Sequence, residues 1–114
     1  MKVAFSIEAG GDLAASLCPA FGRAPRFLVH DLEAGLTMAF DNEAAAGAHG
    51  AGTGAAALMA RHAVDAVVSG RFGPKAFDAL QAAGIGMYVC ATPCSANDAL
   101  ERFRAGSLAK AEMA

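Results

Sequence analysis

Five short stretches rich in strand-forming residues recur along this chain of 114 residues, and polar or glycine-containing segments separate them. They cover residues 2–7, 26–33, 36–42, 64–69 and 86–90. In the first stretch Val3, Phe5 and Ile7 share one face by the two-residue period of a strand. Ala34-Gly35 supplies a tight turn between the second and third stretches, which predicts a β-hairpin. The chain must therefore build a sheet from short strands.

Three helical segments follow the hairpin, and they alternate with the last two predicted strands. They cover residues 55–62, 74–83 and 95–104. Pro74 suits a first helical turn, and Phe77 and Leu80 lie on one helix face. The order β-β-β-α-β-α-β-α predicts one α/β domain over residues 1–114, with a five-stranded mixed sheet flanked by helices. We expect the first, fourth and fifth strands to be parallel at the centre and the hairpin to form an antiparallel wing. The tail at 107–114 is expected to be frayed or a short interaction segment.

Composition excludes several classes of protein. The formal net charge is −2 at pH 7, and the chain has one tyrosine and no tryptophan. Nucleic-acid binding needs a basic surface and often aromatic rings for stacking; no basic stripe occurs here, and one tyrosine without tryptophan leaves little for base stacking. The apolar runs stay well below the roughly 20 residues that cross a bilayer, and the N-terminal run is too short for a signal peptide. We expect a cytoplasmic protein without membrane or nucleic-acid partners, whose three cysteines stay reduced.

Several motifs, spread from about residue 2 to residue 108, together resemble one known family. After the strand at 2–7 they are, in order, Pro19 with Phe21-Gly22-Arg23-Ala24-Pro25, a strand ending at Asp31, His49-Gly50-Ala51-Gly52, Val64-Asp65 with Val67-Val68-Ser69-Gly70, Gly73-Pro74-Lys75-Ala76-Phe77 with Ala79-Leu80, and Ala82-Ala83-Gly84-Ile85. No single motif is specific. Their order and spacing are similar to those of the dinitrogenase iron–molybdenum cofactor binding family.

The resemblance implies a ribonuclease-H-like sheet and a non-catalytic protein that binds an anionic metal–sulfur cluster. Family relatives include cofactor carriers of nitrogenase assembly and the orange protein, which carries a molybdenum–copper sulfide cluster. The implied cofactor is a molybdenum-containing cluster with iron or copper. The implied partners are cluster donor or acceptor proteins, and we expect a monomer or a weak dimer. Fold alone would not imply this cargo.

The carboxyl ends of the predicted parallel strands define the expected binding edge, because open α/β sheets bind ligands there. Three helices also begin at this edge, near Thr53, Pro74 and Ser95, and their free N–H groups favour an anion. The residues that we expect to contact the cofactor are Cys18, Arg23, His49, Gly50, Gly52, Arg71, Gly73 and Cys94. Arg23 could instead form a surface ion pair of little consequence.

Four of the side chains near this edge are candidate metal ligands, because thiolate and imidazole suit iron and copper. They are His49, Cys18, Cys90 and Cys94. His49 lies in a glycine-rich loop, where a capping or solvent-exposed role is the alternative. Cys18 could be a small buried apolar residue, as free cysteine often is. Cys90 and Cys94 form C-x3-C, unlike the C-x2-C of redox and zinc motifs, so core packing and a reversible disulfide both stay open.

Two other functions remain open beside the cluster carrier. A regulatory or interaction module would use the same edge to bind a small anion or a partner protein without metal. A two-metal nuclease would need clustered carboxylates. Asp12 and Asp41 could reach the edge, but a third acidic ligand has no obvious position. We therefore expect a carrier and not an enzyme.

Overall fold

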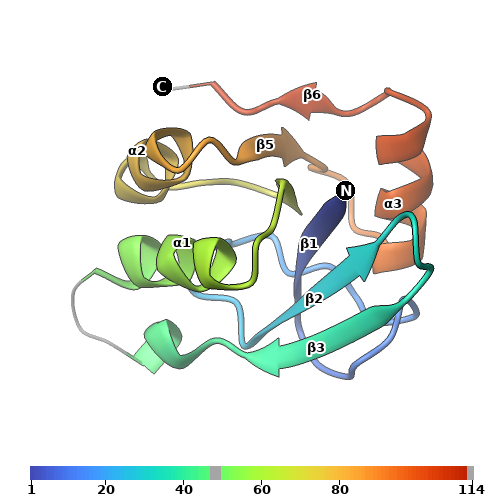
Figure 1. Cartoon of the computed structure of the whole chain (residues 1–114), viewed down its shortest axis with the longest axis horizontal. Helices are drawn as coiled ribbons and strands as arrows, with labels where there is room; N and C mark the ends of the chain where they lie inside the picture. The colour runs from blue at the N-terminus through green and yellow to red at the C-terminus, as the bar shows by residue number, and fades with distance from the viewer. Residues whose placement is uncertain (47–49, 113–114) are drawn as a thin grey trace.

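The computed structural model describes residues 1–46 and 50–112, which form a six-stranded mixed sheet with helices on both faces (Figure 1). The strands are β1 (Lys2–Ile7), β2 (Arg26–Asp31), β3 (Thr37–Asp41), β4 (Ala66–Ser69), β5 (Gly86–Val89) and β6 (Ala109–Lys110). The helices are the 3-10 helix η1 (Glu43–Ala46) and the α-helices α1 (Ala51–Arg61), α2 (Pro74–Ala82) and α3 (Ala96–Arg104). Within these residues, none of the helices combines the length and apolar character needed to cross a membrane.

The strand order is β3-β2-β1-β4-β5-β6, with β1 at the centre of the sheet. In register, Phe5 of β1 pairs with Leu28 of β2 on one side and with Val68 of β4 on the other. The β1–β4 and β4–β5 pairs are parallel, whereas β2 is antiparallel to both β1 and β3. The predicted arrangement of three parallel central strands and an antiparallel hairpin wing is confirmed.

The prediction of a five-stranded sheet with a frayed tail at 107–114 was wrong, because residues 109–110 form a sixth strand. Tyr88 and Val89 of β5 pair antiparallel with Lys110 and Ala109 of β6. The Ala111 N–H continues the pairing by donating to the carbonyl oxygen of Met87 at 2.9 Å. A strand of two residues is too short to show any period in its sequence, so its only signal is the edge of β5 that it covers.

Helix α1 begins at Ala51, four residues before the predicted start at 55. Gly52 and Gly54 lie in this first turn, and glycine is the weakest helix former after proline. The Gly54 N–H nevertheless donates to the Gly50 carbonyl at 2.7 Å, which closes the first helical turn. Close packing overrides the low propensity, since a Cβ on Gly54 would lie 2.6 Å from the Ala44 Cβ and a Cβ on Gly52 would lie 3.0 Å from the Ala76 Cβ.

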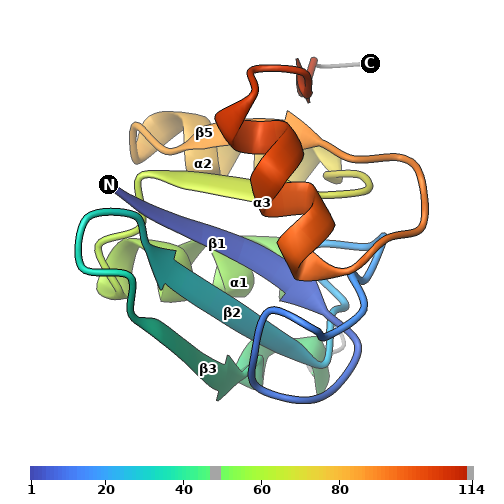
Figure 2. The ribbon, with the colours of Figure 1, turned by 90° about the vertical axis from the view of Figure 1, so that its right-hand side faces the viewer.

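Two hydrophobic cores lie on the two faces of the sheet. Figure 2 shows α3 across one face, with α1 and α2 behind the other. On the α3 face, Val3, Phe5 and Ile7 of β1 pack with Leu100. On the α1 and α2 face, the core includes Ala4, Phe21, Phe27, Met59, Val67 and Leu80. The alternating pattern of β1 thus sends its larger side chains to the α3 face.

Candidate anion-binding site

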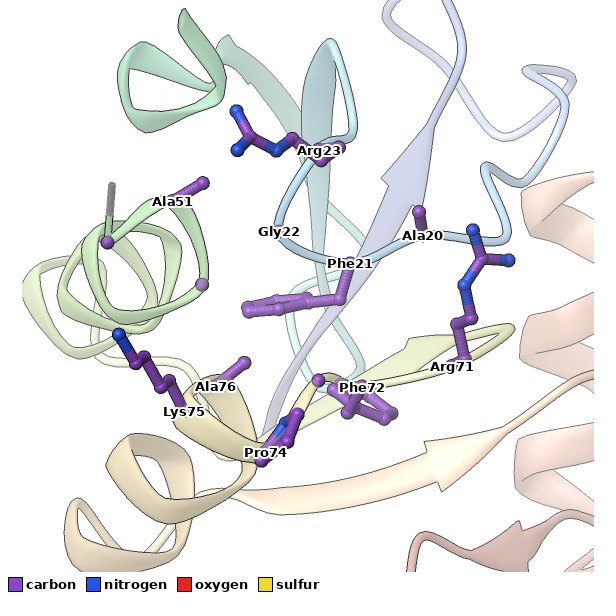
Figure 3. A pocket seen from close by; sticks show the side chains of 13 residues that line it. Ala20, Phe21, Gly22, Arg23, Ala51, Arg71, Phe72, Pro74, Lys75 and Ala76 are labelled. Atoms are coloured by element: carbon purple, nitrogen blue, oxygen red, sulfur yellow. The ribbon is translucent and has the colours of Figure 1, made fainter. Parts of the chain in front are cut away.

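A cavity of about 480 Å³ opens at the edge where β1 and β4 end (Figure 3). Three segments that are far apart in the chain form its walls. They are the β1–β2 loop at residues 20–23, the start of α1 at 50–52, and the β4–α2 segment at 71–76. The position is the one that the strand order predicts for a ligand in an open α/β sheet.

Backbone contacts between glycines hold these three walls together. A Cβ built on Gly22 would lie 3.0 Å from the Gly52 Cα, and a Cβ on Gly52 would lie 3.0 Å from the Ala76 Cβ. At the base of the third wall, a Cβ on Gly70 would lie 2.7 Å from both the Cα and the carbonyl oxygen of Pro19. At Gly70 a Cβ would force the backbone to shift, and at Gly22 and Gly52 it would push the neighbouring wall away, so these glycines allow the close spacing of the walls.

Two helix N-termini line the cavity without side-chain caps. Helix α1 follows Gly50, whose φ of 75° favours glycine, and α2 follows Gly73; neither residue provides a capping side-chain hydrogen bond. The first turns of both helices are part of the cavity wall, so their free N–H groups and the positive ends of their dipoles lie there. Helix α3 differs, because the Ser95 hydroxyl accepts a hydrogen bond from the Asp98 N–H at 3.1 Å. Of the three helix starts expected at the site, two line it.

The charged side chains of the described lining are all cationic. Figure 3 shows three cations around the opening: Arg23 from the β1–β2 loop, and Arg71 and Lys75 from the β4–α2 segment. Among the thirteen residues that line the cavity in the described part of the chain, no aspartate or glutamate occurs. The Arg23 Nη1 donates to the Ala45 carbonyl at 2.8 Å, which ties the guanidinium to η1. The electrostatics of this lining favour an anion.

Gly73 has no structural requirement for glycine. Its φ of −71° and ψ of 164° suit any residue, and a Cβ there would meet nothing within 4 Å. A methyl group at this position would stand at the wall of the cavity. The absence of a side chain keeps the approach to the α2 N-terminus open, as close contact with a ligand requires.

The structure brings together five of the residues predicted to contact a cofactor. Arg23, Gly50, Gly52, Arg71 and Gly73 all line the cavity. The sequence reasoning did not select Lys75 or the aromatic pair beneath the cations, Phe21 and Phe72, whose ring centroids are 5.3 Å apart. Lys75 had a usable signal, since it directly follows Pro74 at the start of a helix predicted to face this edge.

The three cysteines among the predicted metal ligands do not line the cavity. His49 lies outside the described residues, so its predicted role stays a prediction. Cys18 is 6% exposed and packs in the core beneath the cavity, where its Sγ contacts the Ala20 carbonyl oxygen at 3.6 Å. Burial raises the pKa of the Cys18 thiol. In this environment Cys18 is a small buried residue, the alternative that its sequence left open.

Cys90 and Cys94 lie on the α3 face and form a separate group. Their Sγ atoms are 3.3 Å apart, and the Arg102 Nη1 donates to the Cys90 Sγ at 3.3 Å. Burial and the neighbouring Cys90 thiol raise the pKa of Cys94 to about 11. The three cysteines are thus split between the two cores. Within residues 1–46 and 50–112, no three His, Cys, Asp or Glu side chains are grouped to hold a metal ion.

A second cavity of about 610 Å³ lies away from this edge and contains no predicted site residue. Lys2, Asp31, Arg61 and His62 contribute to its lining together with exposed Leu36 and Met38. Its charged residues include a carboxylate, so it lacks the uniform charge of the first cavity. The cationic cavity is the better candidate for the functional site.

Fold and site together define an α/β protein with a cationic pocket at the carboxyl edge of its sheet. The sequence pattern of the family described as dinitrogenase iron-molybdenum cofactor matches residues 1–106, and the chain belongs to this family. The expected family resemblance is confirmed.

Relatives of known sequence or structure are similar to this protein over nearly its full length. The apo form of the orange protein from Desulfovibrio gigas is similar with a TM-score of 0.92 and 34% identity, over 96% of this chain and 92% of that one. A NifB-like Thermotoga protein of the DUF35 family gives a TM-score of 0.83 and 28% identity, over 96% and 91% of the two chains. An uncharacterized protein of Methanocaldococcus jannaschii is 33% identical, over 98% of this chain and 92% of that protein.

Proposed function

We propose that this protein binds an anionic molybdenum-containing metal–sulfur cluster, with iron or copper, and carries or stores it without catalysing a reaction. One observation carries the proposal. Three cationic side chains and two uncapped helix N-termini surround a single cavity whose described lining has no acidic residue. The proposal includes the ribonuclease-H-like relationship of the sheet, a cytoplasmic location and donor or acceptor proteins for the cluster.

The chemistry of such a cluster suits this lining. Sulfide ligands of an anionic cluster accept hydrogen bonds, so backbone N–H groups and guanidinium groups can hold it with few covalent bonds. A carrier must also release its cargo, and hydrogen bonds break more readily than several metal–thiolate bonds. The family name and the apo form of the orange protein support a cofactor-binding role.

The alternative is a metal-free module that binds a small anion or a partner protein at the same edge. It is favoured by the described lining, which supplies cations and N–H groups but no thiol. The two functions differ in what the purified protein contains. Metal and sulfide content therefore decides between them.

The first experiment is to purify the protein without oxygen from its native host and to measure molybdenum, iron, copper, sulfide and the visible spectrum. A carrier contains molybdenum with iron or copper and shows sulfide-to-metal absorption bands. The metal-free chain is then incubated with tetrathiomolybdate and copper or iron. A colourless protein that also fails to take up these components would favour the metal-free module.

A matched pair of arginine variants tests the site. Arg71→Ala removes a cation of the cavity, whereas Arg104→Ala removes an exposed cation at the end of α3 on the other face. Loss of a charged hydrogen bond costs about 1.5–3 kcal/mol, so Arg71→Ala should weaken cluster binding about tenfold or more. Arg104→Ala should bind like the parent. Equal binding by both variants would place the cluster elsewhere.

A further inference from the structure

Two thiols and a guanidinium meet on the α3 face, away from the anion-binding cavity. The Cys90 and Cys94 sulfur atoms are 3.3 Å apart without a disulfide, and Arg102 donates to the Cys90 sulfur at 3.3 Å. None of these three residues lines the cavity of about 480 Å³. We propose that Cys90 and Cys94 bind one monovalent copper ion, Cu(I), between their two sulfur atoms.

The backbone around both cysteines is anchored, so the sulfur pair is a product of the fold. The Cys90 N–H donates to the Ser69 carbonyl at 2.9 Å, which continues the β4–β5 pairing past Val89. The Cys94 carbonyl accepts from the Leu17 N–H at 2.9 Å, and the next residue, Ser95, caps α3. The anchored backbone preorganises the positions of the two residues, and rotation of the less buried Cys94 side chain widens the 3.3 Å gap between the sulfur atoms to admit the ion.

The ligand set selects the metal. Thiolate sulfur is a soft ligand that favours Cu(I), a closed-shell ion for which two sulfur ligands suffice. Structural zinc takes four protein ligands, and no third His, Cys, Asp or Glu joins this pair in the described part of the chain. Cys90 is 4% exposed, and a small cavity of about 80 Å³ beside it is lined by Leu17, Pro19, Ala91 and Pro93 among others. The burial of Cys90 limits the access of water to its sulfur atom.

The binding step balances without any change of oxidation state. Two S–H bonds break, two S–Cu bonds form, and two protons pass to solvent while copper stays Cu(I). Two thiolates and one Cu(I) carry a net charge of −1. The Arg102 guanidinium, already in contact with the Cys90 sulfur, neutralises that charge.

The test uses the reduced, metal-free chain without oxygen and without molybdenum. Cu(I) is added in competition with a colorimetric Cu(I) chelator, and native mass spectrometry counts the bound ions. The parent should take one Cu(I) that Cys90→Ser and Cys94→Ser each lose. Arg102→Met should hold the ion about tenfold more weakly, as expected for loss of a charged hydrogen bond.

Two controls separate this site from the proposed cluster site. Cys18→Ala removes the remaining cysteine, and Arg71→Ala alters the cluster cavity; both should retain one Cu(I). If Cys90→Ser does not fold, the less buried Cys94→Ser decides. The proposal is overturned if the parent binds no Cu(I), if Cys94→Ser retains it, or if Cys18→Ala loses it. Loss of two hydrogens per chain in place of copper uptake would identify a disulfide and also overturn it.

Discussion

Gly70 and Gly73 lie three residues apart between β4 and α2, but only Gly70 is required by the packing of the fold. A Cβ on Gly70 would collide with the Pro19 backbone at 2.7 Å, whereas a Cβ on Gly73 would meet nothing within 4 Å. The first glycine therefore serves the packing of the fold. The second serves access to the α2 N-terminus.

Alanine at the two positions should have different effects. Gly70→Ala forces backbone shifts and should lower the free energy of unfolding by about 1–3 kcal/mol. Gly73→Ala should change it by less than about 1 kcal/mol, because alanine restricts the unfolded chain but is a poorer N-cap than glycine. Only Gly73→Ala should bind the cluster less well per folded molecule. Urea unfolding and tetrathiomolybdate uptake measure the two effects.

Gly11→Ala is the matched control for this pair. Its Cβ would make an ordinary 3.7 Å contact with the Ala39 Cβ, away from the cavity. It should leave cluster uptake unchanged. Normal uptake by Gly73→Ala would show that the open α2 N-terminus does not contact the cargo.

The buried thiol of Cys18 makes stability depend on pH. Burial raises its pKa above the ordinary thiol value of 9.0, with Glu8 acting in the same direction and Arg71 opposing it. Above that ordinary value the unfolded chain loses the proton while the folded chain keeps it. The stabilisation from the neutral buried thiol is therefore full below pH 9 and declines as pH rises through the folded pKa.

Denaturant titrations between pH 7 and pH 10.5 check this expectation. The free energy of unfolding should fall more steeply with pH in the parent than in Cys18→Ala, since the variant lacks the thiol. The difference between the two slopes isolates Cys18 from the lysines and the tyrosine that titrate in the same range. Parallel curves would mean that the Cys18 thiol has the same pKa in both states.

At the residue scale, the sequence predicted several residues that line the cavity, but it did not predict that the three cysteines lie outside this lining. Arg23, Arg71 and the glycines could be predicted because each follows a strand or opens a helix at one edge. Cys90 and Cys94 follow a strand at the same edge but lie on the α3 face. A shift of one residue reverses the face of a strand side chain, and the sequence does not fix that register at a strand end.

At the scale of elements, α3 and α2 differ in whether a side chain caps the N-terminus. Helix α3 has the Ser95 cap and lies away from the cavity, whereas α2 begins uncapped at its wall. A side-chain cap on α2 would satisfy the N–H groups that we assign to the cargo. Stability and anion binding therefore compete at Gly73.

Gly73→Asp tests that competition directly. Aspartate is a good N-cap and should stabilise α2 by a few tenths of a kcal/mol, roughly, over glycine. Its carboxylate would also place negative charge at the cavity wall and should abolish uptake of an anionic cluster. Thermal unfolding and metal analysis follow the two properties. Gly73→Asn keeps the cap without the charge and should bind at an intermediate level; full uptake by Gly73→Asp would argue against an anion at α2.

The sequence predicted the long elements well and the short ones poorly. Residues 2–7 have a clear period of two, and β1 has those bounds. The predicted start of α1 was wrong because Gly52 and Gly54 lie in close contact with Ala76 and Ala44 of neighbouring segments, and local helix propensity does not include such contacts. β6 was missed because its two residues gain their conformation only from pairing with β5.

At the scale of the whole molecule, the sheet separates the proposed cargo site from the cysteine pair. Leu80 of α2 and Leu100 of α3 are buried in the two different cores. Alanine at either position should lower the free energy of unfolding by about 2–5 kcal/mol. Leu80→Ala should also weaken cluster uptake, because α2 frames the cavity. Leu100→Ala should not do so when uptake is measured per folded molecule, by calorimetry and metal analysis together.

A uniform loss of uptake in both leucine variants would indicate that the two faces are coupled through the sheet. Retention in both would indicate that the cavity does not depend on the packing of α2. Both comparisons require a temperature at which each variant is folded. Circular dichroism establishes that temperature for each protein.

The close backbone contact of Gly22, Gly52 and Ala76 has a consequence for how this protein can evolve. The shape of the cavity resides in main-chain atoms, whereas its charge resides in Arg23, Arg71 and Lys75 at the opening. Substitutions among the three cations can alter which anion is held without disturbing the spacing of the walls. Proteins that descend from one ancestor can thus bind different anions while they keep the same main-chain cavity.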